Sequence, residues 1–279
     1  ATDADGDNLT YTVSGPDAGL FNLNSATGEL TWNTAPDYEA NASAASNNDY
    51  LVEVTATDDG AGALTDLQSI TVTVTDVNDA PVITTLDGNA TSTVSAAENQ
   101  TAVIDVNATD ADGDTLTYSI SGGADQALFA IDAGNGTLSF ATAPDYESNA
   151  SAAGNNDYLV EITVTDDGAG ALTDLQAITV IVTDVNDAPV ITTLGGNATS
   201  AVSAAENQTA VTDVNATDAD GDTLTYSISG GADLALFAID SGTGVLTFAT
   251  APDWESNASA AGNNDYLVDV TVTDDGAGA

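Results

Sequence analysis

The stretch DYLVEITVTDDGAGALTDLQAITVIVT, residues 157–183, decides the fold. In 158–164 and again in 178–182, every second residue is Tyr, Val or Ile, and most residues between them are polar. A period of two places one set of side chains on the buried face of a β-strand. The run DDGAGA at 166–171 is typical of a turn. The stretch therefore predicts two strands, 157–165 and 172–183, joined by a turn.

This pattern recurs along the chain with a period of 108 residues. APDYE at 35–39 returns at 143–147 and as APDWE at 251–255, and TDVNDAPVITTL at 75–86 returns at 183–194. A repeat of that length is large enough to be a domain with its own core. We predict three units, 1–79, 80–187 and 188–279, of which the first lacks its N-terminal part and the third its C-terminal part.

Within the complete unit, alternating runs rich in Thr and Val predict β-structure throughout. We expect seven strands, at 90–97, 101–108, 115–121, 128–132, 137–141, 157–165 and 172–183. The alanine-rich run SNASAAGNND at 148–157 lacks apolar periodicity, so it is predicted as a loop. Seven short strands in about 100 residues indicate an all-β chain of tandem seven-stranded Greek-key β-sandwich domains. Tyr118, Phe129 and Phe140 are expected in the core, with Trp32 at the position of Phe140.

The charge balance excludes several functions. The chain carries 44 acidic residues and no Lys or Arg, giving a net charge of −44, and it has no His and no Cys. Such a chain is repelled by nucleic acid and has no basic residue for a phosphate. Zinc and thiolate sites and Ser-His-Asp triads need residues that are missing. No apolar run approaches the ~18–20 residues of a membrane span. We expect cations as partners, with no nucleic acid and no direct membrane insertion.

The motif DADGD, at 3–7, 110–114 and 218–222, places three carboxylates in five residues. Two bare carboxylates ~5 Å apart repel by roughly 3 kcal/mol at an effective dielectric constant near 20. Calcium takes six to eight oxygen ligands and removes that repulsion. An EF-hand loop is excluded, because Thr115 and Ser121 occupy the positions where it needs Gly and Glu. The motif therefore predicts a calcium site of another kind.

The chain resembles the cadherin repeat family. VEVTATDDGAGALTDLQSITVTVTDVNDAPV at 52–82 is similar to the closing strands and linker of such a repeat. AEN at 97–99, DYE at 145–147, DVNDA at 184–188, DAD at 218–220 and Asp274 follow the order of the family's calcium motifs. The resemblance implies that several calcium ions lie at each junction and take ligands from two neighbouring repeats.

The ligands that the resemblance implies fall into three sets. At the junction of units one and two they are Asp37, Glu39, Asp76, Asn78, Asp79, Asp110, Asp112 and Asp166. At the junction of units two and three they are Glu98, Asp145, Glu147, Asp184, Asn186, Asp187, Asp218, Asp220 and Asp274. Facing linkers outside these two junctions are Asp3, Asp5 and Asp58 at one end and Glu206, Asp253 and Glu255 at the other.

The sequence departs from the family pattern in three ways. Tyr146 and Trp254 replace the Arg of the second motif, which removes a basic residue but no oxygen ligand. Ala80 and Ala188 replace the last Asn of the linker motif, where a backbone carbonyl can serve as well. Each repeat also carries a third acid in DADGD and a second in TDDG, which are Asp114 and Asp167 in the second unit.

Two readings of those additional acids stay open: further calcium sites, or solvated surface charges. Isolated acids such as Asp125, Asp174 and Asp213 are expected to be solvated surface charges.

Two functions fit these expectations. The first is structural, a calcium-rigidified stalk or filament segment, with near-identical repeats that set its length. The second is an adhesin region that binds cells or surfaces in a calcium-dependent way; self-association with further copies would join the two. We expect no enzyme, because a glycosidase needs one asymmetric carboxylate pair, whereas these acids recur in every repeat. Extracellular calcium modules bind at ~10⁻⁴–10⁻³ M, which indicates an extracellular or cell-surface setting, with a bacterial or archaeal surface array as our hypothesis.

Overall fold

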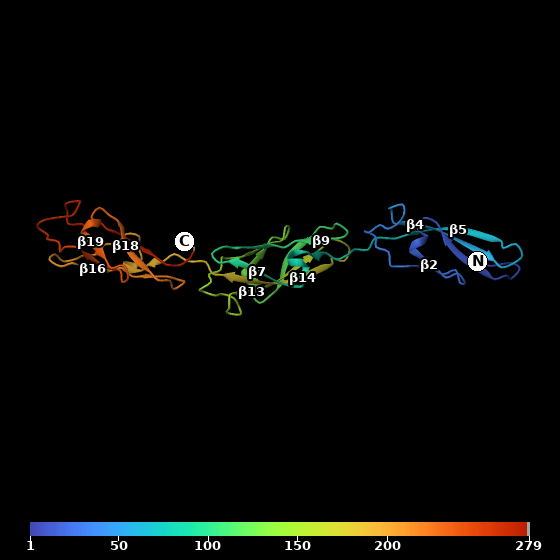
Figure 1. Cartoon of the computed structure of the whole chain (residues 1–279), viewed down its shortest axis with the longest axis horizontal. Coiled ribbons are helices and arrows are strands. Elements are labelled where there is room, and N and C mark those ends of the chain that lie inside the picture. Colours follow the sequence, from blue (N-terminus) through green and yellow to red (C-terminus); the bar gives the residue numbers. More distant parts are fainter. Residues whose placement is uncertain (278–279) are drawn as a thin grey trace.

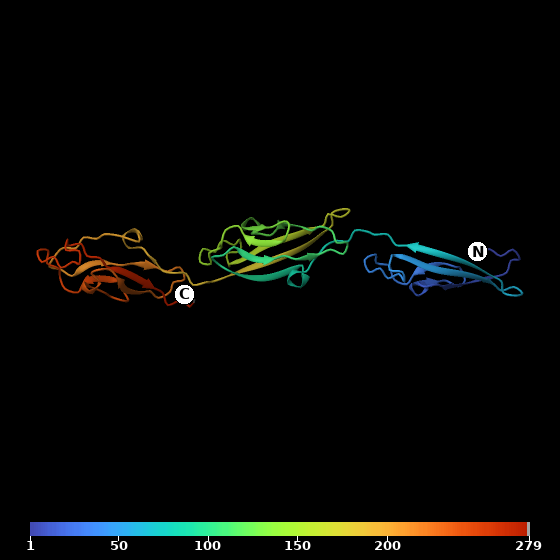
Figure 2. The same cartoon turned by 90° about the horizontal axis from the view of Figure 1, so that it is seen from above.

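A computed structural model describes residues 1–277 of the chain. Three β-rich units follow one another along the longest axis of the molecule, joined by single extended segments (Figures 1 and 2). Each unit has its own hydrophobic cluster, which includes Tyr50 in the first unit, Val160 in the second and Leu246 in the third. Residues 1–277 contain no α-helix, and no helix there is long and apolar enough to cross a membrane.

The middle unit consists of two packed sheets and a short strand pair. The first sheet has the order β10 (Thr117–Gly122), β13 (Asp157–Thr165), β14 (Thr173–Thr183), β7 (Thr91–Ala97). The second has the order β11 (Phe129–Ile131), β12 (Thr137–Phe140), β8 (Ala102–Asp105). The pair is β6 (Val82–Ile83) with β9 (Ala108–Thr109). This arrangement confirms the predicted all-β sandwich.

The seven predicted strands are all present, with one difference. The run at 101–108 is divided, because β8 pairs with β12 in the second sheet whereas β9 pairs with β6. Between the two, the backbone N–H of Val106 donates to Gly136 O (2.9 Å) instead of a strand partner. The alternation of the sequence does not reveal that change of partner.

Residues 157–183 form the hairpin that organises the unit. β13 and β14 pair antiparallel over nine residue pairs, from Asp157↔Ile181 to Thr165↔Thr173. β7 runs parallel to β14, from Thr91↔Ala177 to Ala97↔Thr183. The first long strand of the unit therefore lies beside its last, and the linkers enter and leave at opposite ends (Figure 2).

The core follows the predicted alternation. Val160, Ile162, Ile178 and Val180 are fully buried. The rings of Phe129 and Phe140 stack with centroids 4.6 Å apart, and Tyr158 meets Phe140 edge-on at 5.3 Å. In the first unit Trp32 takes the place of Phe140, stacking on Phe21 at 4.1 Å. The prediction that these aromatics are core residues is confirmed.

The outer units repeat parts of this plan. The first contains β1 (Leu9–Ser14), β4 (Asp49–Asp58) and β5 (Thr65–Thr73) in one sheet and β2 (Phe21–Leu23) with β3 (Leu30–Trp32) in the other. The third contains β15 (Val190–Ile191) with β17 (Ala216–Thr217), β16 (Ala210–Asp213) with β20 (Val245–Phe248) and β19 (Phe237–Ile239), and β18 (Thr225–Gly230) with β21 (Asp269–Thr273). Short 3-10 turns complete the units: η1 (Ala18–Leu20), η2 (Thr85–Gly88), η3 (Gln126–Leu128), η4 (Thr193–Gly195) and η5 (Leu234–Leu236).

The asparagine-rich run before β13 is a loop, as predicted, and a buried acid holds it. Asp125 is only 5% exposed; its carboxylate accepts the N–H groups of Ala152 (2.6 Å) and Leu159 (2.8 Å). The prediction of a solvated surface charge is therefore wrong for Asp125. It is also wrong for Asp174, which accepts the N–H of Ile83 at 2.8 Å. Asp213 is exposed, as expected.

Candidate metal centres at the unit junctions

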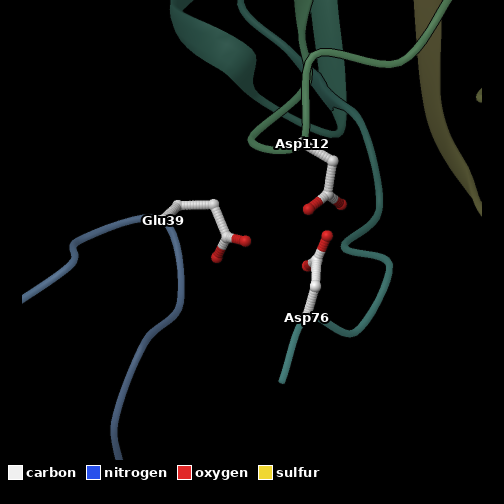
Figure 3. Close-up of side chains that lie close together, drawn as sticks. All are labelled: Glu39, Asp76 and Asp112. Atoms are coloured by element: carbon white, nitrogen blue, oxygen red, sulfur yellow. The ribbon is translucent and has the colours of Figure 1, made fainter. Parts of the chain in front are cut away.

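Three carboxylates from three different segments converge between the first and second units. Glu39 lies in the loop after β3, Asp76 in the linker after β5, and Asp112 in the loop after β9. Their side chains point toward one another (Figure 3), with one oxygen of each within 4.8 Å of the other two. The site thus includes groups from both units and from the linker.

The DADGD loop is folded by its own first acid. Asp110 Oδ1 accepts the backbone N–H groups of Asp112 (3.0 Å) and Asp114 (3.2 Å), which brings the three carboxylates within 4.8 Å of one another. The linker is attached to this loop, because the N–H of Asp79 donates to Asp112 Oδ2 at 2.7 Å. The spacing of acids in the motif is therefore what gathers them.

The last hairpin loop of the second unit reaches the same place. Asn78 donates its Nδ2 hydrogen to Asp166 Oδ2 at 3.2 Å. Asp166 is 4% exposed, and its Oδ1 accepts the N–H groups of Gly168 (3.0 Å) and Leu172 (3.1 Å). The linker amide and the hairpin acid, far apart in sequence, are thereby brought together.

The second junction has a fuller set of acids. Glu98 is 3% exposed; Oε1 accepts the N–H of Val185 (2.8 Å) and Oε2 that of Tyr146 (2.6 Å). One oxygen each of Glu98, Asp145 and Glu147 forms one close group, and Glu147 with Asp184 and Asp220 forms another. Glu147 belongs to both groups, which makes a continuous acidic cluster along the junction.

The linker of the second junction is attached like that of the first. Asp187 N–H donates to Asp220 Oδ2 (2.7 Å), and Asn186 Nδ2 donates to Asp274 Oδ1 (3.1 Å). Asn99 Nδ2 also donates to Asp187 Oδ1 at 2.9 Å. Asp218 Oδ1 accepts the N–H of Asp222 (3.1 Å), so the third DADGD loop folds like the second.

The predicted ligands at the two outer ends are arranged similarly. Glu206, Asp253 and Glu255 form a close group, with the N–H of Trp254 donating to Glu206 Oε2 at 3.0 Å. At the other end Asp3 Oδ1 accepts the N–H of Asp5 (2.8 Å).

Two further predicted ligands support local turns. Asp58 Oδ1 accepts the N–H of Gly60 (3.0 Å), as Asp166 does for Gly168. Asp37 Oδ1 accepts the N–H of Ala40 at 2.9 Å, which supports the turn after DYE.

Several carboxylate oxygens at both junctions are buried without a donor. These are Asp110 Oδ2, Asp112 Oδ1, Asp218 Oδ2 and Asp220 Oδ1. A buried carboxylate oxygen without a hydrogen bond is costly, and no Lys, Arg or His exists in this chain to offset it. Calcium prefers an all-oxygen set of this kind, so the residues present fit that ion.

The electrostatics of the second junction point the same way. Desolvation, followed by the neighbouring Asp220 and Glu98 carboxylates, raises the pKa of Asp184 above its ordinary value of 3.8. Desolvation raises the pKa of Glu147 above its ordinary value of 4.5. A hydrogen bond from the Glu147 backbone N–H opposes this rise in part, and the Glu98 carboxylate adds to it. Mutual repulsion disfavours the ionised cluster, and a bound cation would reverse that effect.

Solvent reaches the first cluster through an open hollow of about 410 Å³, lined by Glu39, Asp76 and Asp112 and by the side of the asparagine-rich loop. An ion can therefore enter without any rearrangement of the fold.

Sequence reasoning missed the backbone donors of Tyr146 and Val185, which have no side-chain signature. It also missed Gly168 and Gly276, where a Cβ would collide with the Asn78 and Asn186 amide oxygens respectively. The Gly that follows each TDD is the one signal that could have indicated them.

Comparison with protein-family models matches residues 92–183 to the Cadherin domain. Human Protocadherin Fat 4 is 30% identical over 221 residues, covering 76% of this chain and 4% of that protein. Mouse Cadherin EGF LAG seven-pass G-type receptor 2 is 31% identical over 275 residues, covering 94% of this chain and 9% of that protein. The chain thus spans less than a tenth of the length of these relatives.

Solved structures of tandem cadherin domains share the fold. Extracellular cadherin domains 3–6 of protocadherin Gamma B2 are 26% identical, with a TM-score of 0.52, covering 99% of this chain and 66% of that one. Domains EC21–23 of human CDH23 have a TM-score of 0.55 at 19% identity, covering 95% of this chain and 88% of that one. A protocadherin gammaB7 structure, described as a cis-dimer, has a TM-score of 0.52 at 24% identity, covering 97% of this chain and 68% of that one.

Proposed function

The chain is a tandem array of cadherin-like repeats, and we propose that it is a calcium-rigidified stalk or filament segment of an extracellular or cell-surface protein. In this proposal the units are 1–79, 80–187 and 188–279, with several calcium ions at each junction. The ions of the first junction are held by the predicted ligand set that runs from Asp37 to Asp166, and those of the second junction by the set that runs from Glu98 to Asp274.

One observation carries this proposal. At the first junction Glu39 of one unit, Asp76 of the linker and Asp112 of the next unit lie within reach of a single ion. An ion held by all three would fix the angle between the two units, because its ligands belong to both. Without an ion the same charges repel, and a single extended linker offers little resistance to bending.

Adhesion is the second candidate function. The outer face of the β13–β14 hairpin exposes Leu159 (43%) and Leu175 (46%), each opposite a threonine in the ladder. A neighbour of the same fold is described as a cis-dimer. In this second reading, further copies of the chain associate laterally through the hairpin face.

We assign no enzymatic activity to the chain. The acidic groups recur at every junction with the same partners, whereas a glycosidase needs one distinct pair of carboxyl groups. The chain also lacks the His, Cys and Lys side chains that nucleophilic catalysis commonly uses.

The test is a comparison of the full chain in millimolar calcium, in millimolar magnesium and in excess chelator. We expect calcium to raise the melting temperature measured by circular dichroism, and magnesium to do so much less, because Mg²⁺ demands a stricter octahedral geometry. Small-angle scattering should give the largest maximum dimension in calcium and a broader, more compact distribution in chelator.

Equal melting temperatures and equal scattering profiles in calcium and chelator would refute the proposal. Lateral association is separated by sedimentation: calcium-dependent dimers, lost in a Leu159→Ser/Leu175→Ser variant, would support the adhesion reading.

A further inference from the structure

Each repeat has two acids beyond the ligand motifs, and the structure gives them different environments. In the second unit these are Asp114, the third acid of DADGD, and Asp167, the second acid of TDDG. Their counterparts in the third unit are Asp222 and Asp275.

Asp167 and Asp275 are hydrogen-bond acceptors within the fold. Asp167 Oδ1 accepts the N–H of Thr115 at 2.7 Å, and Asp275 Oδ1 accepts that of Thr223 at 2.8 Å. In the first unit Asp59 accepts the N–H and the Nδ2 hydrogen of Asn8, which lowers its pKa. In all three units the second acid of TDDG therefore attaches the end of the DADGD loop to the last hairpin, which is a structural role.

Asp114 and Asp222 have no such partner. Among residues 1–277 neither carboxylate accepts a hydrogen bond; only their backbone N–H groups are engaged, with Asp110 and Asp218. Both side chains are partly buried. Protein groups within the described part of the chain therefore give no reason for their placement.

Each of these carboxylates faces another hydrogen-bond acceptor, the amide oxygen of a linker asparagine. Asp114 Oδ2 and Asn78 Oδ1 both occupy the space that a Cβ on Gly168 would fill. Asp222 Oδ2 and Asn186 Oδ1 stand in the same relation to Gly276. The amide nitrogen of Asn78 is bonded to Asp166, which turns its oxygen toward Asp114. Two acceptor oxygens with no proton between them repel, unless a cation lies beside both.

We propose that Asp114 and Asp222 are additional calcium ligands, each supplying one carboxylate oxygen to an ion that Asn78 and Asp110, or Asn186 and Asp218, also hold. Asp110 Oδ2 and Asp218 Oδ2, which are buried and accept no hydrogen bond, lie in the same DADGD loops and are available to that ion. The small size of Gly168 and Gly276 is what allows the amide and carboxylate oxygens to meet. The inference rests on the proposed function and adds one charged ligand to each junction.

The first test replaces both carboxylates by the isosteric amide, Asp114→Asn with Asp222→Asn, in the full chain. Calcium titration of the stripped protein by calorimetry should show a loss of about tenfold in affinity, because calcium affinity follows the number of charged ligands. The control is Asp213→Asn, which removes one charge from an exposed residue outside the predicted ligand sets. The control should bind calcium like the parent chain.

Melting temperatures separate a ligand from a structural residue. In chelator the double variant should melt at or above the parent chain, because a repulsive charge is gone. In calcium it should melt below the parent chain. A lower melting temperature in both conditions would show that the carboxylates support the fold itself, and would overturn the proposal.

A second variant changes the space available in the same site and leaves its charge unchanged. Gly168→Ala introduces a Cβ where the two oxygens meet and should also weaken calcium binding at the first junction. Gly134→Ala is its control, because the nearest atom to a Cβ there is Asp132 Oδ1 at 3.5 Å.

The outcomes distinguish this inference from the function on which it rests. Unchanged affinity in the double variant, with a calcium-binding parent chain, would overturn the inference alone. A parent chain that binds no calcium would overturn both.

Discussion

At the scale of single residues, carboxylates of this chain have two distinct tasks. Asp17, Asp125 and Asp233, at most 5% exposed, each accept two backbone N–H groups and so replace a missing strand partner in the loop beside them. Four acids of the junctions instead each keep one buried carboxylate oxygen without a donor. A sequence shows both groups as the same letter, since the difference lies in what surrounds each side chain.

Removing a carboxylate of the first kind should destabilise the fold whether or not calcium is present. Asp125→Ala leaves the N–H groups of Ala152 and Leu159 without their acceptor, at a cost of about 3 kcal/mol in the free energy of unfolding. Urea denaturation followed by circular dichroism measures the loss, and amide hydrogen exchange should be faster at 148–159.

Asp213→Ala is the control for that experiment, because Asp213 is exposed on β16. Equal stability of the two variants would mean that water satisfies the loop N–H groups as well as Asp125 does.

At the scale of elements, the junction is built almost entirely from loops. The acids come from the loops after β3 and β12, the linkers after β5 and β14, the loops after β9 and β17, the hairpin loops after β13 and β21, and the turn after β7, while the strands set their separation. The resemblance to the cadherin repeat, carried by the order of the motifs, predicted which loops supply ligands to one junction, and that ligand role stays a prediction. The strand alternation also predicted the hairpin and the core, because burial on one face leaves a period of two in the sequence.

Other features of the elements could not be predicted, for physical reasons. The division of 101–108 into β8 and β9 depends on which sheet each half joins, and that choice is made by distant strands. The buried position of Asp125 depends on a loop 27 residues further along the chain. The role of Gly168 as a space for two oxygens appears only when linker and hairpin are placed together.

The junction loops should give the calcium-free chain an unusual pH dependence. The pKa values of Asp184 and Glu147 are raised in the folded state, so this state binds more protons than the unfolded chain in the window above the ordinary values of 3.8 and 4.5. Their contribution to stability is complete below those values and is lost as the pH rises through the folded pKa values. Calcium-stripped protein should therefore melt at a higher temperature near pH 5 than near pH 7.

With calcium bound the sign reverses, because the ion keeps the same carboxylates ionised and acid displaces it. Melting curves at both pH values, with and without calcium, check the two signs. A stripped protein that loses stability on acidification from pH 7 to about pH 5 would contradict the repulsion described for these loops.

At the scale of the whole molecule, the chain is a row of units whose contact with one another is confined to acidic junctions (Figure 1). The period of 108 residues predicted separate cores, and three hydrophobic clusters are present. A charge of −44 on such a row opposes collapse of one unit onto another, but it does not fix the angle between neighbouring units, which we assign to the ions at the junctions.

The parallel pairing of β7 with β14 has a mechanical consequence. Tension applied through the two linkers pulls β7 from its N-terminal end and β14 from its C-terminal end, which are opposite ends of the same ladder. The seven residue pairs from Thr91↔Ala177 to Ala97↔Thr183 are then loaded together in shear, and none can open before the others. Among residues 1–277, no strand of the first or the third unit has a parallel neighbour of this kind. In an optical-tweezers experiment on this chain, the middle unit should therefore rupture last and at the highest force.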